Sequence, residues 1–235
     1  CLDRAGLVGG DGAVHHGFLD ITYLRGFPNM TLLAPADELE LEAVLRFALQ
    51  HKTACAIRYP RDNVPESLGD ARPFVLGKSR LLHEGNDATI LAYGATVSHA
   101  MDAAELLTAD GISARVVNAR FAKPIDADMV RQAIESSHPV VTVEDHSVAG
   151  GFGSAVLETA NALGLPTDRI LRLGMPADRF IAQVNRVGQL AECGIDAAGI
   201  AATVQDLVRS KPSDAVANRI AATQSAFQRG DSLIS

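Results

Sequence analysis

The sequence has little cysteine and no excess of positive charge. Its three cysteines, Cys1, Cys55 and Cys193, are odd in number and form no Cys-x-x-Cys pair, so they indicate neither a disulfide framework nor a zinc site. We therefore expect no metal site and a reducing, cytoplasmic environment. Lysine and arginine number 21 against 28 acidic residues, which gives a formal net charge of -7. This balance argues against nucleic-acid partners and anionic membrane surfaces, because both attract clustered cations.

Long apolar runs and an initiator methionine are also missing. No apolar segment of the sequence approaches the roughly 18 residues that a membrane-spanning helix needs, so we expect no membrane partner. The first residues do not resemble a signal peptide, and a targeting segment upstream of Cys1 would lie beyond this sequence. Because Cys1 and Leu2 open directly on a motif rich in glycine and charge, we expect the chain to be a piece of a longer protein.

Apolar runs and helical patterns alternate along most of the chain, in which 47% of the residues are apolar. Short apolar runs bounded by turn residues predict strands, and longer stretches with capping residues predict helices. The expected strands are 30–34, 54–59, 88–93, 114–119, 139–144 and 169–174. The expected helices are 37–50 with Asp37 as cap, 98–110, one opened by Asp126, one from the turn at 149–153 to Leu163, and 196–210. This alternation predicts an α/β fold whose mostly parallel sheets are covered by helices and joined by right-handed crossovers.

One segment interrupts the alternation. Between residues 61 and 77 the chain contains Pro65, Gly69 and Pro73 and shows no sustained periodicity. The predicted organisation is therefore a first unit over 1–62, a linker over 63–77, a second unit over 78–210 and a polar tail over 211–235 that is either a dangling helix or disordered.

The segment from 3 to 17 reads DRAGLVGGDGAVHHG and combines charge with five glycines. Glycine permits backbone conformations and close approaches that other residues resist. Asp11 and His15 could therefore face one small volume, where a carboxylate and an imidazole can orient a hydroxyl group or pass a proton. On spacing alone, an ordinary Asp-Gly turn with an exposed histidine is the favoured explanation. We assign no role to His16.

Two arginines lie near predicted extended segments. Arg4 is close to the start of the chain, and Arg61 follows the strand predicted at 54–59. Ligands of parallel sheets bind outside the carboxyl ends of the strands, so both guanidinium groups could hold a phosphate. Taken singly, each arginine is better explained by a structural ion pair, for example with Asp3 or Asp62.

A glycine-rich turn, AGGFG at 149–153, precedes a predicted helix as phosphate loops do. The turn matches neither of the two common nucleotide-binding patterns, so a tight packing turn is the preferred interpretation. Three polar residues, Glu144, Asp145 and His146, precede it. They could form a polar cluster, be exposed to solvent or lie at a subunit contact.

Several motifs in series resemble one family. They are DRAGLVGGDGAVHHG, AIRYPRDN, NARFAKPID and VEDHSVAGGFGSAVLE. Over about residues 2–209 they resemble the 1-deoxy-D-xylulose-5-phosphate synthases, which are thiamine-diphosphate enzymes of the transketolase-like class. The resemblance implies that 1–62 is the latter part of a pyrimidine-binding domain and that 78–210 is a transketolase C-terminal-like domain.

The resemblance also implies roles for four of these residues. Arg4 in Asp-Arg-Ala-Gly and Arg61 in Arg-Tyr-Pro-Arg would hold the phosphate of the aldehyde acceptor. Asp11 and His15 match the family's Asp-Gly-x-x-His loop and would act as catalytic residues on that acceptor. The family joins pyruvate and D-glyceraldehyde 3-phosphate, with loss of carbon dioxide, to give 1-deoxy-D-xylulose 5-phosphate for isoprenoid and thiamine biosynthesis. We therefore expect a transferase that forms a homodimer.

The resemblance implies thiamine diphosphate and Mg²⁺ as cofactors of the full-length enzyme. The family's diphosphate motif and its activating glutamate have no match in this sequence, so we expect no diphosphate or metal site here and no activity of the chain alone. A β-subunit of a 2-oxo acid dehydrogenase, a transketolase and a non-catalytic dimerisation module are the alternatives. The segment AQVNRVGQL, residues 182–190, departs from the family pattern, and we expect it to lie at the periphery.

Overall fold

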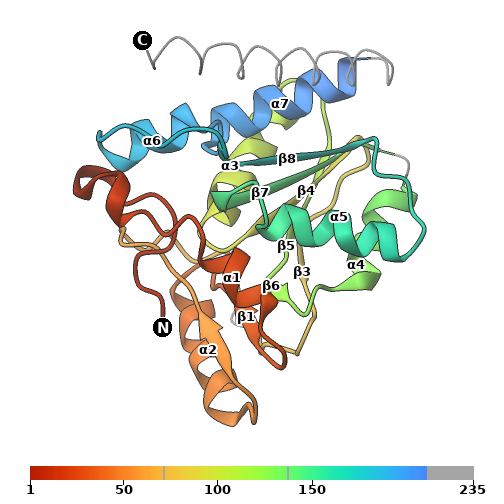
Figure 1. The fold of residues 1–235 in the computed structure, drawn as a ribbon. Coiled ribbons are helices and arrows are strands. Elements are labelled where there is room, and N and C mark those ends of the chain that lie inside the picture. Colours follow the sequence, from red (N-terminus) through yellow and green to blue (C-terminus); the bar gives the residue numbers. More distant parts are fainter. Residues whose placement is uncertain (71, 137, 211–235) are drawn as a thin grey trace.

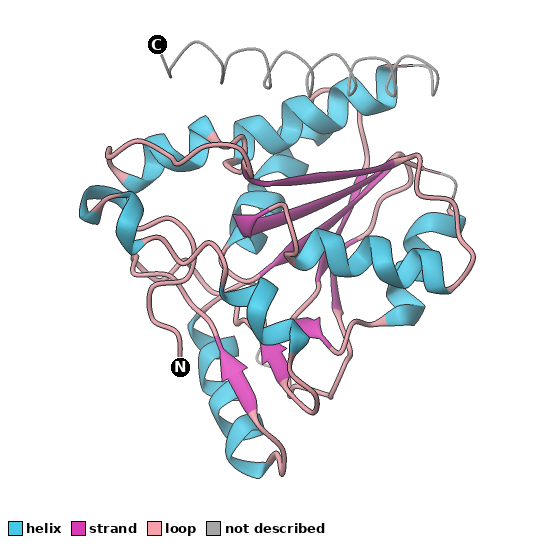
Figure 2. Ribbon diagram, in the orientation of Figure 1, coloured by secondary structure: helices cyan, strands magenta, loops and turns pink. Residues whose placement is uncertain are grey.

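The structure is a computed structural model that describes residues 1–70, 72–136 and 138–210, and its strands form two sheets (Figure 1). The strands are β1 (Thr31–Leu33), β2 (Cys55–Ile57), β3 (Arg80–His83), β4 (Ala88–Tyr93), β5 (Ala114–Asn118), β6 (Phe121–Lys123), β7 (Val140–Ser147) and β8 (Ile170–Met175). The helices are α1 (Asp20–Gly26), α2 (Glu38–Gln50), α3 (Thr96–Ala109), α4 (Ala127–Glu135), α5 (Phe152–Ala162), α6 (Arg186–Glu192) and α7 (Ala197–Arg209). Figure 2 shows the helices packed around the strands.

The larger sheet has the strand order β3-β5-β4-β7-β8. Strands β5, β4, β7 and β8 are parallel, and β3 is antiparallel at the edge. Every residue of β4 and β7 is buried, as expected for central strands that are covered on both faces. Helices α3 and α7 cover one face, and α4 and α5 cover the other (Figure 1). The prediction of a mostly parallel, helix-covered sheet is confirmed.

The smaller sheet has the order β2-β1-β6 and takes residues from both sides of the predicted linker. Strand β1 is parallel to β2 and antiparallel to β6. Three phenylalanines, Phe47 of α2, Phe74 and Phe121 of β6, stack edge-on or tilted in the core beneath it. The described residues of 63–77 form neither helix nor strand. The division into a first and a second unit stays a prediction, and the predicted tail, 211–235, lies outside the described residues.

Helix starts follow the capping residues that the sequence shows. The Asp37 carboxylate accepts a hydrogen bond of 2.8 Å from the Glu40 N–H at the start of α2. The Asp126 carboxylate accepts one of 3.3 Å from Met129 N–H at the start of α4. Both predicted caps are confirmed. Four short elements, α1, β3, β6 and α6, are not predicted by the sequence patterns.

Within the described residues, no helix is long and apolar enough to cross a membrane.

Candidate functional site

The segment from Arg4 to Gly17 forms a closed loop. Gly6 and Gly17 exchange two backbone hydrogen bonds, of 3.0 and 2.8 Å, at its base. Two short 3₁₀ helices, Gly9–Asp11 and Ala13–His15, form its tip. Gly12 joins them at φ 83°, a left-handed conformation in which an L side chain would be strained. The loop therefore presents Asp11 and His15 on successive turns.

The structure brings Asp11, His15 and Arg61 together. The Nδ1–H of His15 donates a 2.9 Å hydrogen bond to the main-chain oxygen of Asp11. A guanidinium nitrogen of Arg61 forms an ion pair with the Asp11 carboxylate. Both partners of this pair are open to solvent, with exposed side-chain fractions of 57% for Arg61 and 33% for Asp11. The ion pair suggested for Arg61 with Asp62 is not formed, because the Asp62 carboxylate pairs with Arg186 instead.

Arg4 lies near this group but does not join it. Its guanidinium forms a 3.3 Å ion pair with the neighbouring Asp3, and its side chain is 50% exposed. The backbones do converge, because the N–H of Ala5 donates a 3.1 Å hydrogen bond to the oxygen of Tyr59. The chain beside Arg4 thus runs along the segment that leads to Arg61. The structural ion pair considered for Arg4 is the contact that the structure shows.

Arg58, which the motifs do not single out, anchors the C-terminal end of the loop at Gly17. It follows β2 and is 3% exposed. Its Nε and one Nη contact the two carboxylate oxygens of Asp20 at 2.9 and 3.2 Å. The same Nη reaches the main-chain oxygens of Gly17 and Asp145 at 3.3 and 3.1 Å. The signal in the sequence is an arginine that directly follows an apolar strand.

The N-terminal end of the loop packs against the carboxyl end of β7. Helix α3 follows β4 onto one face of the sheet and α5 follows β7 onto the other, so ligands of doubly wound sheets would bind here. Leu7 is fully buried in the core cluster that includes residues of β4, α3 and β7, and its N–H donates a 2.9 Å hydrogen bond to the Asp145 carboxylate. A side chain at Gly6 would place its Cβ 2.0 Å from the carboxyl carbon of Asp145, so only glycine fits. The loop is therefore fixed to the end of β7, beside the place where such ligands bind.

The glycine-rich turn at 149–153 is a packing turn, as preferred from its sequence. The carboxylate of Glu144 accepts hydrogen bonds from the N–H groups of Phe152 and Gly153, at 2.5 and 2.8 Å. These are the groups that a bound phosphate would need at the start of α5. Burial raises the pKa of Glu144 to about 7. The hydrogen bonds from the two N–H groups lower this pKa, but their effect is smaller than that of burial.

His146 is buried beside Glu144, so the polar residues at the end of β7 form an internal cluster. The Nε2 atom of His146 accepts a 3.2 Å hydrogen bond from the N–H of Ile21, and Nδ1–H donates one of 2.8 Å to the oxygen of Ser147. Both ring nitrogens are thus satisfied by a neutral imidazole. Burial lowers the pKa of His146 to about 4, which keeps the ring neutral near pH 7.

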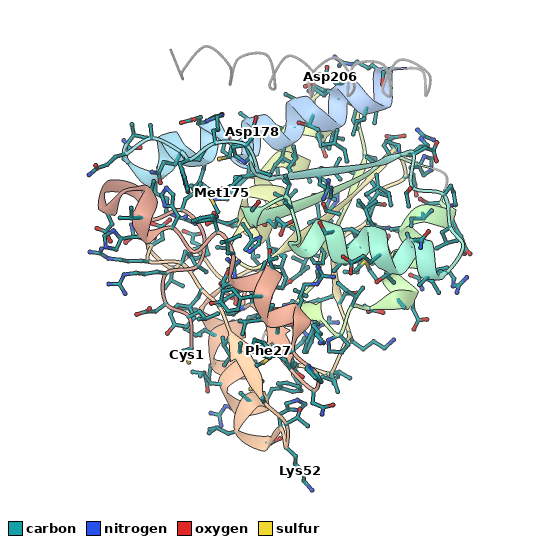
Figure 3. The ribbon with its side chains drawn as sticks, in the orientation of Figure 1. Cys1, Phe27, Lys52, Met175, Asp178 and Asp206 are labelled. Atoms are coloured by element: carbon teal, nitrogen blue, oxygen red, sulfur yellow. The ribbon has the colours of Figure 1, made fainter. Side chains whose placement is uncertain are left out.

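Two cavities flank the loop. One, of about 170 Å³, is lined by residues that include Tyr59, Asp62, His99 and Arg186. The other, of about 300 Å³, lies between Phe18, the end of β8 and the segment that follows it; Figure 3 labels Met175 at the end of β8 and Asp178 on that segment. Arg4, Asp11, His15 and Arg61 line neither of these two cavities. All four residues are exposed on the surface of the protein.

The fold and the site together define an α/β protein with two sheets, in which a charged loop packs at the carboxyl ends of parallel strands. The model of the transketolase pyrimidine-binding domain matches residues 1–67. The model of the transketolase C-terminal domain matches residues 77–200. The chain therefore belongs to the transketolase family.

The curated relatives that the chain resembles are 1-deoxy-D-xylulose-5-phosphate synthases. The sequence is 44% identical to synthase 1 of Geobacter sulfurreducens over 92% of this chain and 34% of that protein. It is 48% identical to the synthases of Thermomicrobium roseum and Thermus thermophilus, in each case over 85% of this chain. These two matches cover 32% and 31% of the relatives. The chain thus spans about a third of the length of these proteins.

Solved structures support the same fold. A split-gene transketolase, described as an inactive β4 tetramer, superposes with a TM-score of 0.78 at 33% identity. That match covers 88% of this chain and 65% of the other. A transketolase from Pichia stipitis in complex with sedoheptulose-7-phosphate superposes with a TM-score of 0.65 at 23% identity, over 88% of this chain and 29% of the other. At that identity the second match shows the fold alone.

Proposed function

We propose that this chain supplies the acceptor-binding part of a synthase that condenses pyruvate with D-glyceraldehyde 3-phosphate, with decarboxylation, to 1-deoxy-D-xylulose 5-phosphate. The observation that carries the proposal is the group formed by Arg61, Asp11 and His15 on two neighbouring loops. These residues stand at the motif positions that give the sequence its resemblance to the synthases, and the curated relatives bear that name.

Arg61 and Arg4 would bind the phosphate group of the acceptor. Without a ligand, each guanidinium is satisfied by a nearby carboxylate, Asp11 for Arg61 and Asp3 for Arg4. Both pairs are exposed, and exposed ion pairs contribute little to stability, so exchange of the carboxylate for a phosphate costs little. A phosphate also fits the planar guanidinium bidentately. Phosphate binding remote from the aldehyde carbon would align that carbon for reaction.

Release of Asp11 from Arg61 would leave its carboxylate free to orient a hydroxyl group of the acceptor. His15 is prepared for the same task by its hydrogen bond. Because Nδ1–H donates to the Asp11 oxygen, the Nε2 atom of the neutral ring is an acceptor that can take a proton from a hydroxyl group. Asp11 and His15 would thus hold or move a proton at the acceptor.

The described residues do not fit the diphosphate and metal end of thiamine diphosphate, which the family implies as cofactor. Among them, no group of three or more His, Cys, Asp or Glu side chains could hold a metal ion. The N–H groups at the start of α5 are already taken by Glu144. We propose that the cofactor is bound by other parts of the complete enzyme, and that this chain contributes to the acceptor side.

Replacing Arg61 by alanine is expected to weaken acceptor binding by about 2–3 kcal/mol, the scale of hydrogen bonds to charged groups. This loss corresponds to an increase of roughly 30- to 150-fold in Kd. The measurement is a titration of the chain with D-glyceraldehyde 3-phosphate, followed by the NMR signals of the Gly12 and His15 amides. Arg46→Ala is the control, because Arg46 also forms an ion pair with a carboxylate, that of Glu42 on α2, and this pair is more exposed than that of Arg61. Equal affinities of the two variants would remove Arg61 from the site.

We also propose that the chain forms a homodimer in the cytoplasm. Several large apolar side chains are exposed in the single chain, among them Tyr23, Phe27 and Phe180 at 54%, 54% and 70%. The three cysteines are free, which fits a reducing environment. Sedimentation should show a dimer or a larger assembly, and a monomer that persists at high protein concentration would contradict the proposal.

A further inference from the structure

We propose that Arg186, Gln189 and Gln183 are positioning residues for the acceptor site, which fix the loop of Asp11 and His15 relative to the loop of Arg61. The inference rests on the proposed function for the identity of the acceptor. It assigns a role to residues 182–190, the segment that departs from the family pattern, and it corrects the expectation that this segment lies at the periphery.

The two glutamines bind the backbone of the loop tip. Gln189 is fully buried, and its amide oxygen accepts a 2.8 Å hydrogen bond from the N–H of Gly9. Its amide nitrogen lies 3.3 Å from the oxygen of Gly9 and 2.9 Å from that of Ala182. Gln183 donates a 2.6 Å hydrogen bond to the oxygen of Gly10. Both polar groups of Gly9 and the oxygen of Gly10 are therefore held immediately before Asp11.

Arg186 connects the two loops. Its Nε donates to the Asp62 carboxylate at 2.6 Å, next to Arg61 in the sequence. One Nη donates to the main-chain oxygen of Leu7, and the other contacts the Asp145 carboxylate at 2.7 Å. Asp145 in turn accepts a 2.9 Å hydrogen bond from the N–H of Leu7. One guanidinium thus joins the loop that carries Asp11, the loop that carries Arg61 and the end of β7.

The local structure of α6 directs these side chains to the loop. Asn185 caps the helix by accepting a 2.8 Å hydrogen bond from the N–H of Gly188. Arg186 and Gln189 are then three residues apart, which places them on one face of the helix. Helix α6 packs against the 3₁₀ helix Gly9–Asp11, and Figure 1 shows α6 beside the red helical segment that follows the start of the chain.

The spacing of the loops matters because the acceptor would contact both. Arg61 would take the phosphate, while Asp11 and His15 would act on the hydroxyl groups, so a shift between the loops misplaces one set of contacts. Small displacements of positioned groups reduce reactivity and binding strongly. The ion pair between Arg179 and Glu192 offers a matched comparison, since it is exposed, lies near the same segment and has no contact with the loop in the described interactions.

Hydrogen exchange tests the positioning role without the need for activity. We expect the amides of Leu7 and Gly9 to exchange roughly fivefold or more faster in Arg186→Ala and Gln189→Met, because each loses a hydrogen bond at the loop. Methionine keeps the volume of Gln189 and removes its amide, so the fold is preserved. Exchange in β4 should stay unchanged, and Arg179→Ala should match the wild type. Unchanged exchange at Leu7 and Gly9, or faster exchange that extends equally to β4, would overturn the inference.

The affinity for D-glyceraldehyde 3-phosphate gives the second readout. For Arg186→Ala and Gln189→Met we expect the Kd for this acceptor to rise roughly tenfold, whereas Arg179→Ala should leave the Kd unchanged. A loosened loop with wild-type affinity would overturn the positioning role. The proposed function fails on a different result, namely that Arg61→Ala leaves the affinity unaltered. In that case the exchange data still decide whether Arg186 and Gln189 fix the loop.

Discussion

Replacement of Arg58 by alanine is expected to destabilise the fold by about 3–5 kcal/mol, the cost of removing one partner of a buried ion pair. The Asp20 carboxylate would remain buried without its bidentate partner. The main-chain oxygens of Gly17 and Asp145 would lose a donor in the same step. Each unsatisfied buried group carries a desolvation cost of its own. The measurement is the free energy of unfolding from urea denaturation at neutral pH.

Three further variants, Arg46→Ala, Asp20→Ala and Arg58→Ala/Asp20→Ala, separate the buried charge from the loss of packing. Arg46→Ala breaks an exposed ion pair and should change stability by no more than about 0.5 kcal/mol. In Arg58→Ala/Asp20→Ala both charges are gone, so the double variant should be less destabilised than the sum of the two single variants. Additive losses would show that Arg58 and Asp20 are not energetically coupled, and the account of Arg58 as the anchor of the loop would then be wrong.

The regular elements with strong local signals could be predicted from the sequence. Strand β4 coincides with the expected range, and the caps Asp37 and Asp126 mark the starts of α2 and α4. These elements combine a clear apolar pattern with a local hydrogen bond. The alternation of strands and helices along the chain also predicted that the larger sheet is mostly parallel.

The elements that were missed depend on contacts distant in sequence. β6 has three residues and follows Arg120, which adopts a left-handed conformation at φ 59°. It is a strand because Leu32 and Leu33 pair with it across about ninety positions of the chain. Helix α6 has seven residues and is held by its contacts with the loop. Such pairings leave no periodic trace in a short segment.

The candidate site was predicted in part. Asp11, His15 and Arg61 were found through the family motifs and lie together, whereas the side chain of Arg4 pairs with Asp3. Arg58 and Arg186 escaped notice for a physical reason. A buried arginine is defined by the carboxylates and carbonyl oxygens around it, and those partners come from segments far apart in the sequence.

Glu144 and His146 are expected to give opposite pH dependences of stability when either is replaced. Glu144 has a pKa raised from 4.5 to about 7 in the folded protein. Its contribution to the free energy of unfolding is therefore present below pH 4.5 and is lost as the pH rises through 7. His146 has a pKa lowered from 6.5 to about 4. Its contribution to the free energy of unfolding is therefore present above pH 6.5 and is lost as the pH falls through 4. Between pH 4.5 and 6.5 the two slopes oppose each other and nearly cancel.

Removal of one group should expose the slope of the other. Glu144→Gln leaves His146, and its stability should rise with pH across 4 to 6.5 by about 3 kcal/mol relative to the wild type. His146→Gln leaves Glu144, and its stability should fall by about 3 kcal/mol as the pH rises from 4.5 to 7. Urea denaturation of the three proteins over this range provides the comparison. The comparison uses the slope of the free energy of unfolding against pH, because each substitution also changes that free energy by an amount that does not depend on pH. Parallel curves would mean that the two buried groups keep their ordinary pKa values, and that burial at the end of β7 does not control their charge.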